Sequence, residues 1–407
     1  MARSFLQPPV RSCPRPLPPP PISLATTRLA ADAIATPSPW SSRAAAGCSA
    51  AVGTLWESVP SPAKVLLLAF VPHVSAPWLL GATAAAHGVA LAVVTPSGPG
   101  GSSRQDAAFR LDVLQRALQL LASLPTTARL PVILVDAHDS FVANAPSAAL
   151  VDLLSRLRDD EVVLGGQCNI APNCLADGAV GKLRQLPAYR RCHDDGYKAC
   201  APNADLLLGL PRALERLLGS VVRVAAAKQG YHRLVRAFEG GALQELYAEG
   251  RADSGIALRI DDGARAFLSL KTCMWPGNYS KSLRGLESCK AHYYNPLAAT
   301  RMPNATSLAH WPRGRPPKWD RCDQAPCSAP LVVQTTPWAG EGADFRHRKL
   351  APLVEAFFPK AELEAPLSLP SRPVLVIDPG AGTTPSTDGA CTVVSTADVL
   401  RRSSSYY

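Results

Sequence analysis

The sequence predicts an α/β fold in which helices flank a mixed sheet. Short all-apolar runs, typical of strands covered on both faces, alternate with segments whose apolar residues have helical spacing. Hydrophobic residues make up 47% of the chain, which is enough for one large buried core. The uncharged stretch 65–103 is broken by prolines, glycines and two histidines. It therefore lacks the roughly 20 consecutive apolar residues of a membrane-spanning helix, and we expect no stable membrane span.

The first expected unit is a strand, a helix and a second strand. Residues 65–71 are apolar and predict a buried strand. An apolar helix is expected over about 76–86, and a second strand over 89–94, with breaks at Pro72 and Gly88. This order indicates a Rossmann-like beginning. No G-x-G-x-x-G motif opens the helix, which disfavours a dinucleotide-dependent oxidoreductase.

The alternation of helices and strands continues further along the chain. Residues 106–124 have apolar positions at approximately helical spacing and predict an amphipathic helix. The all-apolar run 131–135 predicts a central strand. A helix over 148–157 and a strand over 161–164 follow, and 374–378 is a candidate for one more strand.

Composition divides the chain into three parts. Residues 1–62 are rich in Pro, Ser and Ala without a sustained period, so we predict a disordered or targeting leader. The folded domain is expected over 63–314. Residues 315–407 have the composition of a proline-rich, weakly ordered extension and tail.

The cysteines favour an oxidising compartment, whereas the amino terminus favours an organelle. Several of the 11 cysteines fall in pairs in polar stretches, and Asn278 and Asn304 begin glycosylation sequons. These features predict the secretory pathway (the lumen of the endoplasmic reticulum or Golgi) or the extracellular space, with a disulfide between Cys168 and Cys174. Residues 1–31 contain arginines, serines and threonines but no acid, as an organelle transit peptide does. Both localisations stay open.

The net charge of +10 does not by itself predict a nucleic-acid partner. The basic residues are scattered, with no Lys/Arg block and no interleaved aromatic residues. Nucleic-acid-binding proteins carry a clustered basic footprint instead. We therefore expect no nucleic-acid partner.

The segment with the most chemical information is the strand 131–135 and the residues after it. Asp136 and Asp139 follow this strand at its carboxyl end, where open α/β sheets bind ligands. Two carboxylates that converge on one turn can hold a divalent cation through hard oxygen ligands. The same pattern also fits a turn with an Asx cap.

This segment and its surroundings resemble the glycosyltransferase domain of the procollagen-lysine hydroxylases and similar stand-alone algal domains. The resemblance spans 66–314 and includes the stretches 100–106, 162–168, 200–209 and 264–270. It implies a GT-A-like fold, with manganese or another divalent cation as the cofactor. It also implies transfer of a hexose from a UDP-sugar donor to a hydroxyl of a glycan or protein acceptor.

The resemblance also implies a set of site residues. Asp136, Asp139 and His310 would bind the metal, and an imidazole beside two carboxylates suits manganese better than magnesium. Arg110 would lie near the donor, and Asn203 would hydrogen-bond the sugar. In the alternative interpretation, His310 is a packed surface histidine, Arg110 a solvated helix charge and Asn203 a turn residue.

Three positions depart from the family pattern. Lys228 replaces an acidic stretch, Gln167 replaces an acid, and Asp205 stands where relatives have glycine and would clash if the backbone must take positive φ. Asp253 is the candidate for a displaced catalytic acid. Two functions stay open: an active glycosyltransferase that uses Asp253, or a catalytically inactive module that binds nucleotide-sugar or a protein partner. A metal-dependent phosphate hydrolase is a third interpretation.

Overall fold

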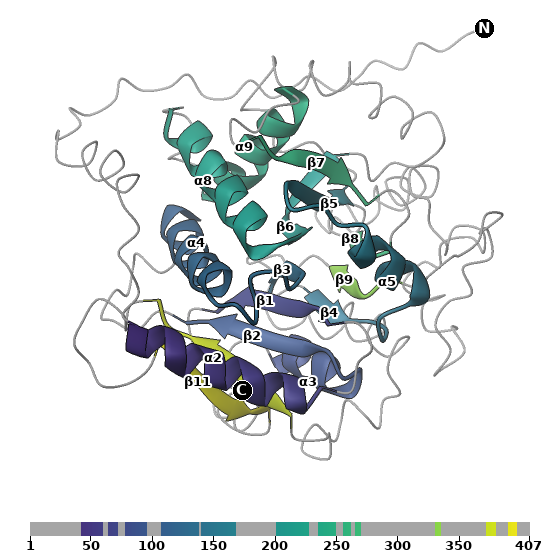
Figure 1. The fold of residues 1–407 in the computed structure, drawn as a ribbon. Coiled ribbons are helices and arrows are strands. Elements are labelled where there is room, and N and C mark those ends of the chain that lie inside the picture. The colour runs from purple at the N-terminus through teal and green to yellow at the C-terminus, as the bar shows by residue number, and fades with distance from the viewer. Residues whose placement is uncertain are drawn as a thin grey trace, which may run out of the picture.

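The computed structural model of the protein describes the following residues: 42–59, 64–71, 78–95, 107–137, 140–167, 201–227, 235–249, 255–261, 265–269, 330–334, 372–379 and 390–396. Within these residues, an eight-stranded sheet and a three-stranded sheet are flanked by helices (Figure 1). The predicted α/β class with a mixed sheet between helices is therefore confirmed.

The large sheet has the strand order β11-β10-β2-β1-β3-β6-β5-β7. From β10 to β3 the neighbouring strands are parallel. Strand β6 then lies antiparallel between β3 and β5, β7 pairs parallel to β5, and β11 is antiparallel to β10. The strands are β1 Leu66–Phe70, β2 Ala90–Val94, β3 Val132–Asp136, β5 Glu161–Gln167, β6 Ala201–Gly209, β7 Ala257–Ile260, β10 Pro373–Ile377 and β11 Cys391–Ser395.

The small sheet has the order β4-β9-β8. Its strands are β4 Ser140–Val142, β8 Phe267–Ser269 and β9 Val332–Gln334. Because β4 starts four residues after the end of β3, the small sheet begins at the carboxyl end of the large one. This arrangement brings the end of β9 into the region where a ligand would bind.

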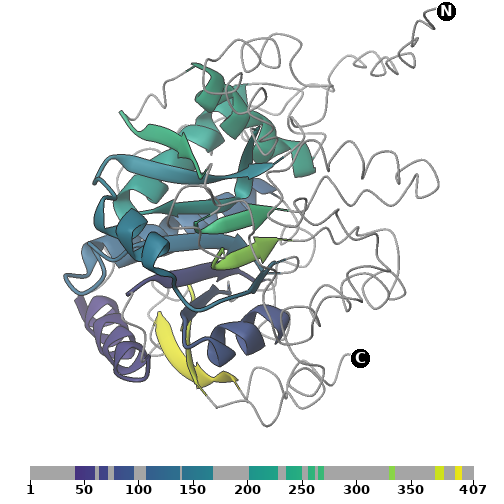
Figure 2. The ribbon, with the colours of Figure 1, turned by 90° about the vertical axis from the view of Figure 1, so that its right-hand side faces the viewer.

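Helices cover both faces of the large sheet (Figures 1 and 2). One face is buried under α2, α4, α8 and α9, and the other under α3, α5 and the small sheet. The helices are α2 Ser42–Glu57, α3 Trp78–Ala86, α4 Ala107–Ser123, α5 Ala148–Ser155, α8 Pro211–Ala227 and α9 Val235–Glu249. The all-apolar run of β1 follows from this arrangement, since Leu66 and Leu68 face one core and Leu67 faces the other.

The strands and helices predicted from the sequence agree with the structure to within a few residues at each end. The strand proposed over 374–378 is β10, at Pro373–Ile377. None of the helices among the described residues is long and apolar enough to cross a membrane. Burial lowers the pKa of His87, in the turn between α3 and β2, because burial disfavours the charged imidazolium.

The prediction that residues 1–62 are unstructured is wrong for 42–59. Helix α2 buries Cys48, Val52 and Leu55 against the large sheet. These residues stand at i, i+4 and i+7, which places them on one helix face. The small alanines between them gave the segment a low-complexity appearance, and they concealed this spacing.

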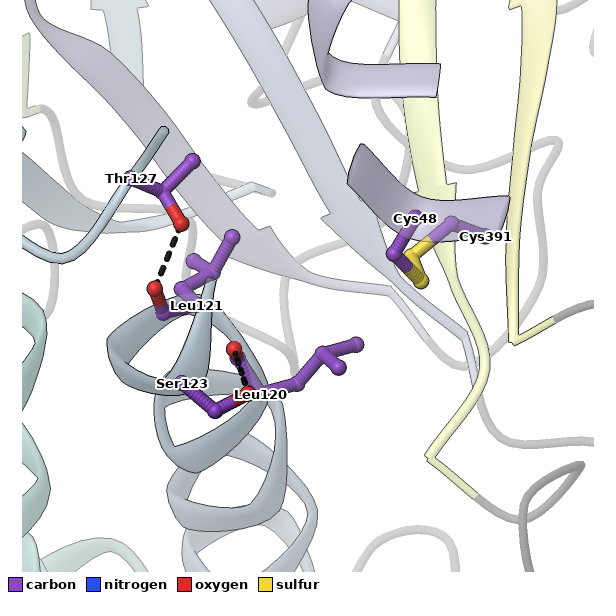
Figure 3. Close-up of a disulfide and its surroundings, with 6 residues drawn as sticks. All are labelled: Cys48, Leu120, Leu121, Ser123, Thr127 and Cys391. Atoms are coloured by element: carbon purple, nitrogen blue, oxygen red, sulfur yellow. Dashed lines mark hydrogen bonds between the residues drawn. A yellow bond between two sulfur atoms is a disulfide. The ribbon is translucent and has the colours of Figure 1, made fainter. Parts of the chain in front are cut away.

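The boundary predicted at residue 314 does not separate a tail from the domain. Strands β10 and β11 belong to the large sheet, and a disulfide joins Cys391 to Cys48 of α2 (Figure 3). Arg372, just before β10, donates hydrogen bonds to the carbonyl oxygens of Ser58 and Ala85 at 2.9 and 3.0 Å. Segments near both ends of the chain therefore form one unit with the central strands.

The predicted Cys168–Cys174 disulfide, both glycosylation sequons and the transit-like segment lie outside the described residues. The Cys48–Cys391 disulfide was not predicted from the sequence, since its cysteines are 343 residues apart. Disulfides form in oxidising compartments. The localisation stays a prediction.

We predict that the double substitution Cys48→Ala with Cys391→Ala lowers the free energy of unfolding by about 2–5 kcal/mol, because the disulfide constrains the unfolded chain across a long loop. Urea denaturation of the full chain measures the effect. Fully reduced wild-type protein serves as the control and should show a similar loss. An unchanged unfolding midpoint in both samples would contradict the prediction.

Candidate functional site

Asp136 is the last residue of β3, and its partner strand places a second carboxylate close to it. In the antiparallel register of β3 and β6, Val135 pairs with Leu206. Asp136 and Asp205 are the next residues just beyond this pair, and one guanidinium reaches both carboxylates. Like charges this close repel each other, so this pair needs a compensating cation.

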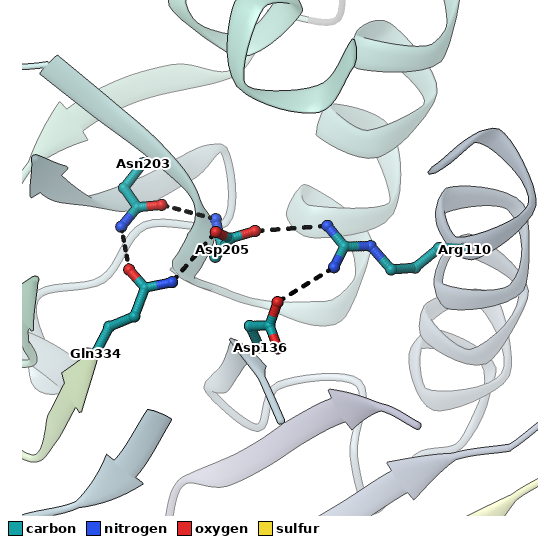
Figure 4. A network of polar contacts seen from close by, with 5 residues as sticks. All are labelled: Arg110, Asp136, Asn203, Asp205 and Gln334. Atoms are coloured by element: carbon teal, nitrogen blue, oxygen red, sulfur yellow. Dashed lines mark hydrogen bonds and ion pairs between the residues drawn. The ribbon is translucent and has the colours of Figure 1, made fainter. Parts of the chain in front are cut away.

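Arg110 supplies that cation from the first turn of α4. One guanidinium nitrogen lies 3.5 Å from Oδ2 of Asp136, and the other lies 3.4 Å from Oδ1 of Asp205 (Figure 4). The helix dipole opposes a cation near a helix N-terminus, and the two carboxylates offset that cost. The three side chains are 29%, 18% and 13% exposed, so they are partly open to a ligand.

Asn203, two residues before Asp205 on β6, is buried at 1% exposure. Its Oδ1 accepts a hydrogen bond from the backbone N–H of Asp205 at 3.1 Å. Its Nδ2 donates to Oγ of Ser269 and to Oε1 of Gln334. Both amide hydrogens are thus used inside the protein, which favours a role for Asn203 in holding Asp205 over direct contact with a sugar.

Gln334 and Ser269 complete the polar network from the small sheet. Gln334 ends β9 and donates from Nε2 to Oδ2 of Asp205 at 3.2 Å. Ser269 ends β8, and its hydroxyl donates to Oε1 of Gln334 at 3.0 Å. Segments far apart in the sequence therefore meet at the carboxyl end of β3 (Figure 4).

A buried carboxylate fixes the start of β8. Asp261 accepts hydrogen bonds from the backbone N–H groups of Arg265, Ala266 and Phe267 at 3.1, 2.7 and 3.0 Å. These charge-assisted bonds fix the backbone of residues 265–267 against Asp261. The position of Ser269 in the network follows from this anchor.

The register of β5 and β6 shifts between Leu164 and Gly165, close to the network. A Cβ atom on Gly165 would lie 2.6 Å from Cβ of Leu206. Only glycine permits this close approach of the two strands. Leu206 directly follows Asp205, so the glycine helps to set where that carboxylate lies.

Three of the predicted site residues, Arg110, Asp136 and Asn203, lie in this one network. Three others, Asp139, His310 and Asp253, are outside the described residues, as is Lys228. The side chain of Gln167 is also not described.

The clash expected at Asp205 depended on a positive φ at that position. Asp205 lies within strand β6, and its side chain is accommodated there, where it contacts Arg110 and Gln334. Sequence reasoning also missed Gln334 and Ser269. A signal for Gln334 existed, because the short apolar run before it is typical of a strand.

The chemistry of this network suits a hard divalent cation only in part. Asp136 and Asp205 offer carboxylate oxygens, which manganese and magnesium accept as ligands. Among the residues that the structure describes, no group of three His, Cys, Asp or Glu side chains gathers as a metal-binding cluster. A cation bound to Asp136 would therefore take further ligands from outside this network, for which Asp139 and His310 are the sequence-based candidates.

No protein-family model matches the chain, and no curated protein is significantly similar to it.

We predict that Gly165→Ala lowers the free energy of unfolding by about 1–3 kcal/mol, because the new methyl group overlaps Leu206 and the packed strands must shift. Thermal and urea denaturation measure the loss. Gly53→Ala is the matched control: a Cβ there has no neighbour within 4 Å, and alanine favours the helix, so stability should rise slightly. Equal changes in the free energy of unfolding from the two substitutions would contradict the close approach of β5 and β6 at Gly165.

Proposed function

We propose that the protein is a metal-dependent glycosyltransferase, which moves a hexose from a UDP-sugar to an acceptor hydroxyl of a glycan or protein. The observation that carries the proposal is the guanidinium of Arg110 between Asp136 and Asp205 at the carboxyl end of a central strand. The resemblance in sequence assigns Arg110 and Asp136 to the donor site without reference to their spatial relation. Their meeting in one network supports that assignment.

The charge of the network is the argument for a metal. One guanidinium (+1) and two carboxylates (−2) sum to −1. A nucleoside diphosphate is itself anionic, so this network alone would repel it. The proposed third carboxylate, Asp139, makes the sum −2. A divalent cation adds +2 and brings it to zero, which removes the repulsion of the diphosphate.

Each residue then has a defined role. Asp136, together with Asp139 and His310 from the sequence-based prediction, would hold the cation, which when bound neutralises the departing diphosphate. The planar guanidinium of Arg110 suits bidentate contact with phosphate oxygens. Oδ1 of Asn203 keeps Asp205 in place by accepting a hydrogen bond from the backbone N–H of Asp205. Asp253 stays the sequence-based candidate for the catalytic acid.

We predict that the full chain of 407 residues binds UDP only in the presence of manganese, and that Asp136→Asn abolishes this binding, because a neutral amide is a much poorer ligand for a hard cation. Calorimetric titration with and without manganese measures both. The full chain is required, since α2 and β10 belong to the folded unit.

Asp152→Asn is the matched control, because Asp152 lies on α5 and pairs with Arg156 at a largely exposed position. It should bind UDP like the wild type. Binding of UDP that is independent of manganese, or that survives Asp136→Asn, would refute the proposed site. Binding without turnover of any UDP-hexose would instead identify a module that binds nucleotide-sugar without transferring it.

A further inference from the structure

Gln334 is a fully buried polar residue that reaches the network from another sheet. It is 0% exposed and stands 129 residues from Asp205. A buried amide is tolerated when its hydrogen bonds are satisfied. Gln334 meets this condition by donating to Asp205 and by accepting from Asn203 at 2.6 Å and from Ser269 at 3.0 Å.

The partners of Gln334 determine which way its amide points. A carboxylate without a proton only accepts hydrogen bonds, so the NH2 group of Gln334 must face Asp205. Its carbonyl oxygen then faces Asn203, which must donate. The backbone N–H of Asp205 only donates, so the carbonyl of Asn203 must face it, which leaves the Asn203 NH2 group for Gln334. The requirements of Gln334 and Asn203 agree, so the orientation of both amides follows from which of their partners donate and which accept.

The two oxygens of Asp205 consequently have different partners. Oδ1 faces Arg110 at 3.4 Å, and Oδ2 faces Gln334 at 3.2 Å. Rotation of the carboxylate away from Arg110 would break the bond with Gln334. The amide of Gln334 therefore holds Asp205 in the orientation that balances the charge of Arg110.

We propose that Gln334 is a positioning residue of the donor site, which fixes Asp205 against Arg110 and so orients the guanidinium for the diphosphate. This inference rests on the proposed function. The positioning role requires a hydrogen-bond donor at position 334, because an acceptor facing Oδ2 of Asp205 would repel the carboxylate. The role is specific to the amide, and a side chain of the same size without a donor does not replace it.

The test is calorimetric titration of the full chain with UDP and manganese at pH 8. Gln334→Glu keeps the shape but turns the donor into an acceptor, and we expect about tenfold weaker binding, as for one lost hydrogen bond to a charged group. Combining Gln334→Glu with Asp205→Asn reverses the polarity of the same hydrogen bond at unchanged net charge. This double variant should regain most of the lost affinity, which a general loss of packing would not allow.

Gln244→Glu is the matched control, because Gln244 is also a buried glutamine, at 2% exposure, and donates to the carbonyl oxygen of Pro202. It should lower the melting temperature and leave the affinity near that of the wild type. If Gln334→Glu does not fold, Gln334→Met replaces it in the titration, because methionine has a similar length and no hydrogen-bond donor. It should also weaken binding.

The outcomes separate the two proposals. If the wild type binds UDP with manganese but the Gln334 variants bind equally well, the positioning role is wrong and the proposed function stands. The positioning role is also wrong if Gln334→Glu weakens UDP binding and the added Asp205→Asn substitution restores none of the lost affinity. If the wild type itself does not bind, the proposed function fails, and the positioning role fails with it.

Discussion

The structure around the candidate site depends on one electrostatic constraint: two carboxylates that lie close together on neighbouring strands. Asp136 ends β3, and the antiparallel pairing of β6 ends at Leu206, which brings the adjacent Asp205 close to it. Such a pair is unfavourable alone. It is tolerable because Arg110 lies against both carboxylates. The position of α4 over the end of β3 is therefore an electrostatic requirement as well as a packing one.

The rest of the fold serves to hold these charges in register. Insertion of β6 between β3 and β5 is what brings Asp205 to the carboxyl end of the parallel strands. Gly165 permits the close approach of β5 to β6, and the small sheet supplies Gln334 behind Asp205. A network that is fully satisfied in this way is rigid, and rigidity is what a binding site for a charged ligand needs.

Much of the fold followed from the sequence, because buried strands form apolar runs and helices show their own period. Asp136 was found because it follows a recognisable strand, whereas Arg110 was predicted only through the resemblance in sequence. Asp205 was noticed only as a departure from the family pattern, and Gln334 was not noticed at all. Their roles depend on strand pairing and on a contact across 129 residues, which no local pattern encodes. Helix α2 was missed for a different reason: the small alanines around Cys48, Val52 and Leu55 concealed their helical spacing.

In the proposed function, a cation and a diphosphate bind together at this charged network. Crystals of the full chain grown with manganese and UDP test it most directly, through the anomalous scattering of manganese. We expect an anomalous peak at ligand distance from a carboxylate oxygen of Asp136, about 2.0–2.6 Å as for hard cations with oxygen ligands, with the diphosphate beside Arg110. A peak elsewhere, or none, with Asp136 contacting no cation would contradict it.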